Sequence, residues 1–283
     1  MSEAETPQRP NEAGQILDIT GLSTENRGAN EAAIRALCRN AYLGQETSLA
    51  RILGRYKMFV DTADVGISSH LLMDGYWEMW TTEAMVATIQ PGATVVDVGA
   101  NLGYFTLLMA DLVGPSGQVH AFEPNSAIAK RLRQSVAVNG FAGRTVVHQL
   151  GLGDHHGLAG FHVEPGEPGG GHVVPVSGDG PTVPVSRLDS LGIVPDFVKI
   201  DAEGAEAAVW RGMAGILALR RPLTVFLEFV PDRYENAGNF LDEILRHGFL
   251  LSRIDPGNGV EPTSRAAVLQ RPANQDQMLV LSR

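Results

Sequence analysis

The pattern of apolar and polar residues divides the chain into three regions. Residues 1–28 are rich in Glu, Gly, Pro and Asn and show no hydrophobic period, which predicts a flexible tail. Residues 29–90 mix short periodic segments and are expected to form a small N-terminal cap. In residues 91–283, apolar runs alternate with segments of helical period. This alternation predicts a doubly wound α/β domain with a mostly parallel sheet and right-handed crossovers.

The alternating region predicts individual elements. Strands are expected at 94–98, 118–122, 145–150, 197–200 and 223–230, and helices at 102–112, 126–139, 205–219 and 239–247. Residues 249–254 and 278–282 are expected to form a final strand pair across the turn sequence PGNG. The first strand, TVVDV, is apolar except for one Asp, as expected of a strand buried on both faces.

The cap is predicted to be mainly helical. A helix is expected from residue 30 to 44, because Ile34, Leu37 and Cys38 recur at helical spacing. Two further helices are expected at 48–53 and 81–89. A strand at 55–61 is expected to pair with a strand at 67–73.

Residues 155–184 interrupt the alternation. They are rich in Gly and Pro and show little periodicity beyond a short strand near 160–163. Four histidines lie in this stretch: His155, His156, His162 and His172. We expect a long excursion from the α/β domain that acts as a lid.

Composition excludes several classes of protein. A formal net charge of -10 argues against nucleic acid as a partner, because nucleic-acid binders carry a basic stripe. Cys38 is the only cysteine, so intrachain disulfides and cysteine metal sites are excluded. The polar, acidic N-terminus does not resemble a signal peptide, and no apolar run is long enough to span a bilayer. We therefore expect a cytoplasmic protein without a membrane partner.

The strongest candidate for a ligand site is VVDVGANLGYFTLLMA, in which a buried strand leads into a glycine-rich turn and then a helix. Gly99 and Gly103 lack Cβ atoms, so the backbone can turn sharply and approach a ligand closely. Ala100 and Asn101 occupy the middle, so the spacing differs from the dinucleotide fingerprint G-x-G-x-x-G, and the Gly-Lys-Ser/Thr ending of a phosphate-binding loop is absent. The turn therefore suits a ligand without phosphate.

Acidic residues near this turn indicate the kind of ligand. Glu123 ends the next strand in HAFEPN, where a carboxylate can accept hydrogen bonds from both hydroxyls of a ribose, and Asn125 follows in the same motif. A ribose without phosphate, beside the acidic Asp97, indicates a nucleoside with positive charge, such as S-adenosylmethionine. Asp154, in GLGD, either accepts a hydrogen bond from the adenine amine or simply makes the turn.

The sequence FVKIDAEGAE is a second candidate site. Lys199, Asp201 and Glu203 alternate at the carboxyl end of a strand, where open α/β sheets bind ligands. The two acids repel each other unless Lys199, a cationic cofactor or a metal balances them. Asp201, Glu203 and Glu228 are candidate catalytic bases for a hydroxyl acceptor, and His172 is a weaker candidate. No full set of oxygen ligands is evident, so no metal is predicted.

At these residues the chain resembles the FkbM family of S-adenosylmethionine-dependent methyltransferases. The resemblance covers about residues 55–230. It rests on DGYWE (74–78), DVGANLGYFTLLMA, FEPN, GLGD, SRLDSL (186–191) and VKIDAEGAE. The glycine loop and VKIDAEGAE are specific when they occur together.

The resemblance implies a Rossmann-like class I methyltransferase sheet of seven strands, mostly parallel with one antiparallel edge strand. It also implies S-adenosylmethionine as cofactor and methyl transfer to oxygen on a sugar, polyketide or similar natural product. Cofactor contact, or a place facing the cofactor or acceptor pocket, is implied for Glu78, Gly99, Asn101, Gly103, Glu123 and Asp201.

Three alternatives stay open. N-methyl transfer needs no strong base. A cofactor-binding module that has lost catalysis would act as a partner protein, although the retention of Asp201 and Glu203 speaks against it. A nicotinamide-linked dehydrogenase is a weaker alternative, because the glycine spacing is wrong. The expected partner is a small molecule with a hydroxyl group, and the sequence is compatible with a monomer or a homo-oligomer.

Overall fold

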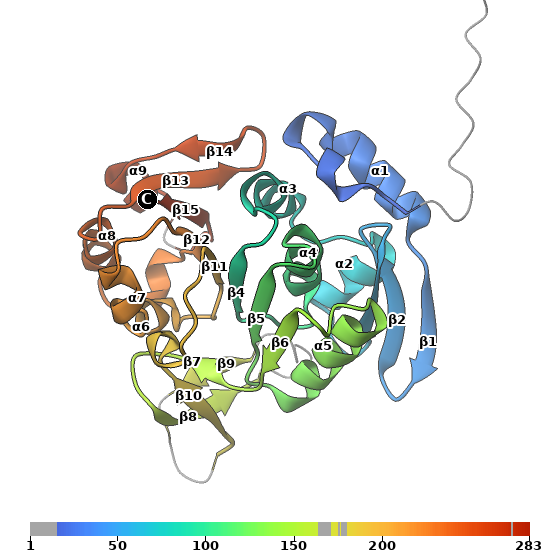
Figure 1. Cartoon of the computed structure of the whole chain (residues 1–283), viewed down its shortest axis with the longest axis horizontal. Coiled ribbons are helices and arrows are strands. Elements are labelled where there is room, and N and C mark those ends of the chain that lie inside the picture. Colours follow the sequence, from blue (N-terminus) through green and yellow to red (C-terminus); the bar gives the residue numbers. More distant parts are fainter. Residues whose placement is uncertain (1–15, 164–170, 175, 177–179, 273) are drawn as a thin grey trace, which may run out of the picture.

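The structure, a computed structural model, describes residues 16–163, 171–174, 176, 180–272 and 274–283 (Figure 1). The largest sheet has eight strands in the order β14-β13-β15-β12-β11-β4-β5-β6. Five neighbouring strands run parallel to one another: β6 (Thr145–His148), β5 (Gln118–Phe122), β4 (Thr94–Val98), β11 (Phe197–Ile200) and β12 (Thr224–Glu228). The prediction of a doubly wound α/β domain is confirmed.

The other end of the sheet is antiparallel. β15 (Met278–Ser282) inserts between β12 and β13 (Leu250–Asp255) and runs antiparallel to both. Without β14 (Gly259–Pro262), this is the expected seven-stranded sheet with one antiparallel strand. Two details differ from expectation, because β15 is internal rather than at the edge, and the PGNG turn joins β13 to β14 rather than to β15.

The parallel strands are buried because alternate residues feed two separate cores. In β4, Val95 packs against one face of the sheet, and Val96 and Val98 pack against the other. The first face is covered by α3 (Met79–Thr88), α4 (Tyr104–Leu112) and α5 (Ser126–Val138). The second face is covered by α6 (Glu206–Arg211), α7 (Ala214–Ala218), α8 (Ala237–Leu245) and α9 (Arg265–Leu269). None of the described helices is long and apolar enough to cross a bilayer.

The helix expected at 205–219 is broken into α6 and α7. Gly212 lies at the break, where a Cβ atom would lie 1.9 Å from the carbonyl oxygen of Gly153. The close approach of these two backbones explains why the chain turns here although the apolar period continues.

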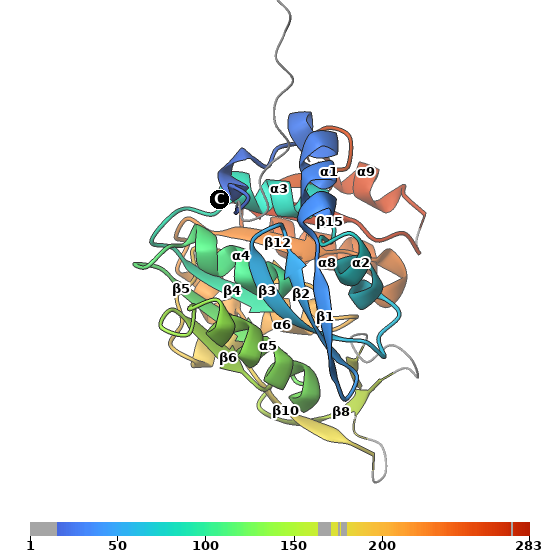
Figure 2. The same cartoon turned by 90° about the vertical axis from the view of Figure 1, so that its right-hand side faces the viewer.

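The N-terminal cap contains a sheet as well as helices. β1 (Asn40–Gly44), β2 (Thr47–Ile52) and β3 (Tyr56–Asp61) are antiparallel, and β3 packs on α5. Figure 2 shows this small sheet in front of α4 and α5. Two helices, α1 (Arg27–Leu37) and α2 (Ile67–Met73), join α3 in the cap.

Three element predictions in the cap are wrong. The helix expected to reach residue 44 ends at Leu37, and the helix expected at 48–53 is strand β2. In β2, Ser48, Ala50 and Ile52 alternate inward, and the polar Ser48 conceals this period of two.

The strand expected at 67–73 is helix α2 instead. Ser68 and Leu71, three residues apart, are fully buried on one side of the helix. Asp64 fixes the start of the helix, because its carboxylate accepts hydrogen bonds from the Ser68 N–H and hydroxyl.

Part of the expected flexible tail is packed against the cap. Ile19 and Leu22 are buried, and Arg27 donates to Glu83 at 2.5 Å. Short 3-10 helices form at Ile19–Gly21 and Thr24–Asn26. Residues 16–28 of the expected tail are therefore packed against the cap, and residues 1–15 lie outside the described part.

The excursion forms a second small sheet. β8 (Gly157–His162), β9 (His172–Val174) and β10 (Thr182–Ser186) join β7 (Gly151–Leu152) in the order β7-β10-β8-β9. Its described residues therefore hold more regular structure than the sequence predicts. Residues 164–170, 175 and 177–179 of the expected lid lie outside the described residues.

Candidate active site

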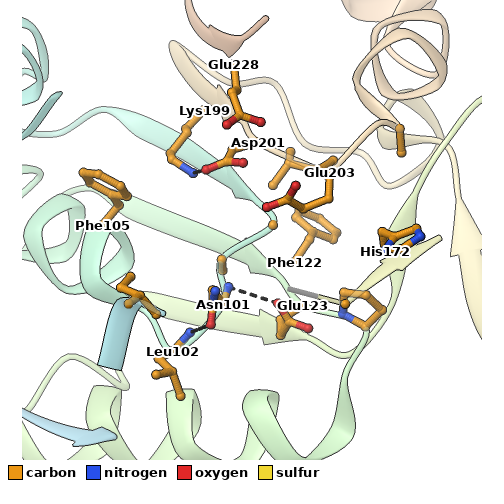
Figure 3. Close-up of a pocket in the computed structure, with 18 of the residues that line it drawn as sticks. Asn101, Leu102, Phe105, Phe122, Glu123, His172, Lys199, Asp201, Glu203 and Glu228 are labelled. Atoms are coloured by element: carbon orange, nitrogen blue, oxygen red, sulfur yellow. Dashed lines mark hydrogen bonds and ion pairs between the residues drawn. The ribbon is translucent and has the colours of Figure 1, made fainter. Parts of the chain in front are cut away.

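A pocket of about 340 Å³ lies at the carboxyl ends of β4, β5 and β11 (Figure 3). The turn after β4 lines it, together with the ends of β5, β11 and β12. Further lining residues come from 64–78 of the cap, from β9 and from Asp276 near the C-terminus. This position, at the carboxyl ends of parallel strands, is where open α/β sheets bind ligands.

The glycine turn forms as predicted. Gly99 has a φ of 73°, and a Cβ there would lie 1.8 Å from the carbonyl oxygen of Asp201. Gly103 has a φ of 96° and borders the side chain of Leu132. Between them Asn101 adopts a φ of 50°. All three predicted turn residues line the pocket with closely approaching backbone.

Glu123 is held at the end of β5 by backbone groups. Its Oε2 accepts from the Asn101 N–H at 3.0 Å and its Oε1 from the Asn125 N–H at 2.7 Å. Burial raises the pKa of Glu123 to about 7, although both N–H groups favour the charged form. Because each carboxylate oxygen has two lone pairs, Glu123 can still accept from two further hydroxyls.

Asn125 holds Glu123 and caps a helix, and it does not enter the pocket. Its N–H binds Glu123, and its side chain caps α5 by accepting from the N–H groups of Ala127 and Ile128. Asn125 does not line the pocket.

Asp97 lies in the sheet beside the pocket but does not line it. The side chain is fully buried, and its Oδ2 accepts from the Thr106 hydroxyl at 2.5 Å. Its register partner on β11 is Lys199. Burial raises the pKa of Asp97, and the charge of Lys199 opposes this shift. The structure thus places Asp97 next to a lysine of the same sheet.

Lys199 is a buried cation. Its ammonium donates to Asp201 at 2.9 Å and lies 5.0 Å from the ring centre of Phe105. Burial lowers the pKa of Lys199, but the charges of Asp201 and Asp97 outweigh burial and raise it overall. The predicted alternation therefore brings Lys199 and Asp201 together as an ion pair.

Arg233 supplies a second positive charge, which sequence reasoning missed. It ends the 3-10 turn Pro231–Arg233 directly after β12, and donates to Glu228 at 2.5 Å and to Glu203 at 2.6 Å. Burial and the charge of Asp201 raise the pKa of both glutamates, and Arg233 opposes the shift. The sequence did offer one signal for this contact, because Arg233 follows by a few residues the strand that ends at the predicted site residue Glu228.

Glu206 has a structural role, as its place in the first turn of a helix suggests. It is fully buried and accepts from the N–H groups of Ala202 and Gly204 at 3.0 Å each. These bonds fix the turn that carries Glu203.

Asp154 and His172, two of the predicted site residues, lie in different places: the first is outside the pocket and the second lines it. Asp154 is turned to solvent, pairs with His155 at 2.9 Å and does not line the pocket. His172 does line the pocket, from β9, as Figure 3 shows. The excursion therefore contributes a wall to the site through its described residues.

Glu78 lines the pocket, as the resemblance implied. It precedes α3 with φ 37° and ψ 67°, a left-handed conformation that is uncommon outside glycine. Burial and the charge of Asp201 raise the pKa of Glu78 to about 7, and Lys199 opposes the shift. Two further lining acids, Asp64 and Asp276, were missed, and only Asp64 has a sequence signal, as a cap of α2.

The pocket has an excess of negative charge. Its described lining residues include one lysine and seven carboxyl groups, those of Asp64, Glu78, Glu123, Asp201, Glu203, Glu228 and Asp276. Such a lining suits a cation and disfavours a pyrophosphate. No group of three or more His, Cys, Asp or Glu among the described residues is arranged to hold a metal ion, and the absence of a metal stays a prediction.

The residues present fit S-adenosylmethionine. The turn at Gly99, packed against the carbonyl of Asp201, lines the pocket, and Glu123 can clasp a ribose. Phe122, Leu150 and Leu152 provide apolar surface for a base. The acidic end of the pocket suits the sulfonium and ammonium charges.

The sheet order and the glycine turn define the fold of class I methyltransferases. The chain belongs to the FkbM methyltransferase family, because the family model described as the methyltransferase FkbM domain matches residues 97–251.

Curated relatives match over shorter segments. The chain is 41% identical over 70 residues to the 31-O-demethyl-FK506 methyltransferase FkbM of Streptomyces tacrolimicus, which is 25% of this chain and 26% of the relative. It is 43% identical over 54 residues to a protein-L-isoaspartate O-methyltransferase of Aeropyrum pernix, 19% and 21% of the two chains. A methyltransferase of Beauveria bassiana is 30% identical over 154 residues, 45% and 61% of the two chains. The chain thus spans between about a fifth and three fifths of the length of these relatives.

Solved structures are similar at low identity. A methyltransferase FkbM of Methylobacillus flagellatus has a TM-score of 0.44 and 16% identity, over 72% of this chain and 54% of that one. A transferase from Pyrococcus horikoshii, described as putative, has a TM-score of 0.47 and 14% identity, over 85% and 72%.

Proposed function

We propose that the chain is an S-adenosylmethionine-dependent methyltransferase whose acceptor is a hydroxyl oxygen on a small molecule, such as a sugar, a polyketide or a similar natural product. The observation that carries the proposal is the row of carboxylates beyond the glycine turn, with Asp201, Glu203 and Glu228 at one end of the pocket and Glu123 at the other. A cationic nucleoside and a group that must lose a proton can lie between them.

The chain's residues have separable tasks in this reaction. S-adenosylmethionine, when bound, supplies a methyl whose bond to sulfur breaks with its electron pair returning to sulfur as the acceptor oxygen takes the methyl. Glu123 and the turn at Gly99 hold the nucleoside, and the acidic end of the pocket faces the sulfonium. A carboxylate within reach takes the hydroxyl proton.

The charge of the pocket supports a neutral hydroxyl over an anionic acceptor. A relative carries the name protein-L-isoaspartate O-methyltransferase, which denotes a carboxylate acceptor. Seven carboxyl groups line this pocket against two cations, Lys199 and Arg233, so a further carboxylate would meet more acidic groups than cations. An alcohol brings no charge of its own.

Two measurements test the proposal. Calorimetry should show binding of S-adenosylhomocysteine and no binding of NAD; the reverse result would exclude the methyltransferase activity. Methyl-labelled S-adenosylmethionine should then label a small-molecule fraction of a cell extract in a form that resists alkali. Volatile label released by alkali would indicate a methyl ester and hence a carboxylate acceptor, and an amine product would indicate N-methylation.

A further inference from the structure

Among the pocket carboxyl groups that the structure describes, Glu78 combines partial burial with the lack of both an ion pair and a backbone N–H donor. Glu123 is bound by two backbone N–H groups, and Asp64 is bound by the start of α2. Asp201 is paired with Lys199, and both Glu203 and Glu228 are paired with Arg233. Glu78 forms no ion pair with any described residue, and Asp276 is exposed.

The pairing matters because it decides which carboxylate can take a proton. The Lys199 ammonium, at 2.9 Å, already holds the carboxylate of Asp201 in an ion pair. Arg233 occupies an oxygen of Glu203 and an oxygen of Glu228 at 2.6 and 2.5 Å. Protonation of either glutamate weakens that ion pair, and Glu228, whose pKa burial raises to about 9, already holds a proton at neutral pH. Protonation of Glu78 weakens no ion pair among the described residues.

The backbone of Glu78 supports a functional role. A non-glycine residue with φ 37° is strained by about 1–3 kcal/mol, and such strain persists where the surrounding structure fixes it, often at functional sites. The residue before a helix often caps it, but the Glu78 side chain makes no capping hydrogen bond. The Glu78 carboxyl group therefore lines the pocket without capping the helix.

From this geometry we infer that Glu78 is the general base, the group that takes the proton of the acceptor hydroxyl as the oxygen–methyl bond forms. The inference rests on the proposed function and assigns the base within it. Burial raises the pKa of Glu78 most, Asp201 and Asp276 raise it further, Lys199 and the Thr81 hydroxyl lower it, and Tyr104 lies close by. The resulting pKa of about 7 suits a base that works at neutral pH.

The test needs no acceptor. Binding of S-adenosylmethionine brings a positive charge that should lower the pKa of Glu78 and release a proton, whereas S-adenosylhomocysteine, a neutral thioether, should release much less. Calorimetry at pH 7 in phosphate and in Tris measures this difference. We expect about 0.4 proton per site if the charge shifts the pKa by one unit.

Variants identify the group. Glu78→Gln should abolish the difference in proton release. Glu78→Asn should do so as well, and it keeps a residue that tolerates the left-handed backbone. Glu228→Gln should keep the difference, and so should Glu235→Gln, which changes an exposed residue outside the pocket. Retained release in both Glu78 variants, or equal release with both ligands in the wild type, would overturn the assignment. Failure of both ligands to bind the wild type would instead overturn the proposed function.

The labelled-methyl assay separates a base from a bystander. Glu78→Gln should lower the rate of methyl transfer at least about 100-fold while leaving the affinity for S-adenosylhomocysteine unchanged. A wild-type transfer rate in this variant would also overturn the assignment.

Discussion

The ammonium of Lys199 donates to the carboxylate of Asp201 at 2.9 Å, within a strand whose other residues are apolar. The lysine is 2% exposed, and the fully buried Asp97 lies beside it on β4. One cation thus compensates two acids where the central strands end, and it lies at the boundary between the core of the sheet and the pocket.

Removal of this cation should destabilise the fold. We expect Lys199→Met to lower the free energy of unfolding by about 3–5 kcal/mol, because it leaves buried charge without a partner. Urea unfolding at pH 7 measures the loss. Lys130→Met, which removes an exposed lysine of α5, is the matched control and should change little. A loss below about 1 kcal/mol for Lys199→Met would contradict the role of Lys199 as the compensating charge.

Arg233 should contribute more to the free energy of unfolding than a surface arginine that is also paired with a glutamate. Arg233→Met is expected to cost about 1–3 kcal/mol at pH 8, because it leaves Glu203 and Glu228 without their donor. Because burial raises the pKa of both glutamates, to about 9 for Glu228, both carry less charge at pH 5 than at pH 8, and the cost should be smaller at pH 5.

The control is Arg211→Met, which breaks the exposed pair with Glu243 at 3.1 Å and should cost less than about 1 kcal/mol at either pH. Equal losses for the two variants, or a cost of Arg233→Met that does not grow with pH, would mean that the pocket pair behaves as a surface pair.

Gly99→Ala should abolish nucleoside binding, because the new Cβ would overlap a backbone carbonyl at 1.8 Å. Gly140→Ala separates this overlap from backbone strain. Gly140 has the same φ of 73°, but no atom lies within 4 Å of the place that its Cβ would take, so its variant should lose only about 1–2 kcal/mol and keep binding. Calorimetry with S-adenosylhomocysteine measures binding, and urea unfolding measures stability. Intact binding in Gly99→Ala would refute the close approach of Gly99 to the carbonyl of Asp201.

Stability without ligand should fall as the pH rises from about 4.5 to 7. The pKa of Glu123 is raised to about 7 in the folded protein from an ordinary value of 4.5. Between these values the unfolded chain has lost a proton that the folded protein keeps, so the contribution is full below 4.5 and lost as pH rises through 7. The loss for this group is about 3 kcal/mol.

Glu123→Gln, which cannot titrate, should show a pH profile of urea unfolding flatter by that amount. Glu235→Gln, at an exposed position, should keep the wild-type slope. In addition, Glu123→Ala should weaken S-adenosylhomocysteine binding by about 1.5–3 kcal/mol, the scale of a hydrogen bond to a charged group. An unchanged affinity would remove Glu123 from the site.

Features set by local sequence could be predicted. The strand–turn–helix at Gly99 and the acid at the end of β5 depend on neighbours within a few residues, and the structure forms both. The pairing of Lys199 with Asp201 follows from alternation along one strand. These relationships need no knowledge of the rest of the chain.

Features set by distant partners could not be predicted. Arg233 reaches Glu203 across thirty residues of sequence, and nothing near Arg233 specifies that contact. Asp97 looked like a ligand residue, but its side chain faces Thr106 and Lys199 inside the sheet. In β2 the inward Ser48 is polar, so a simple apolar count misreads a strand as a helix.

Segment 64–78 and Asp276 flank the family match at 97–251, yet both line the pocket. The proposed nucleoside site, Glu123 and the turn at Gly99, lies inside the match, whereas Glu78 lies outside it. Chimaeras that exchange only these flanking segments between relatives should therefore inherit a new substrate range together with an unaltered donor site. Over evolutionary time, the same division would let acceptor choice diverge while the donor chemistry stayed constant.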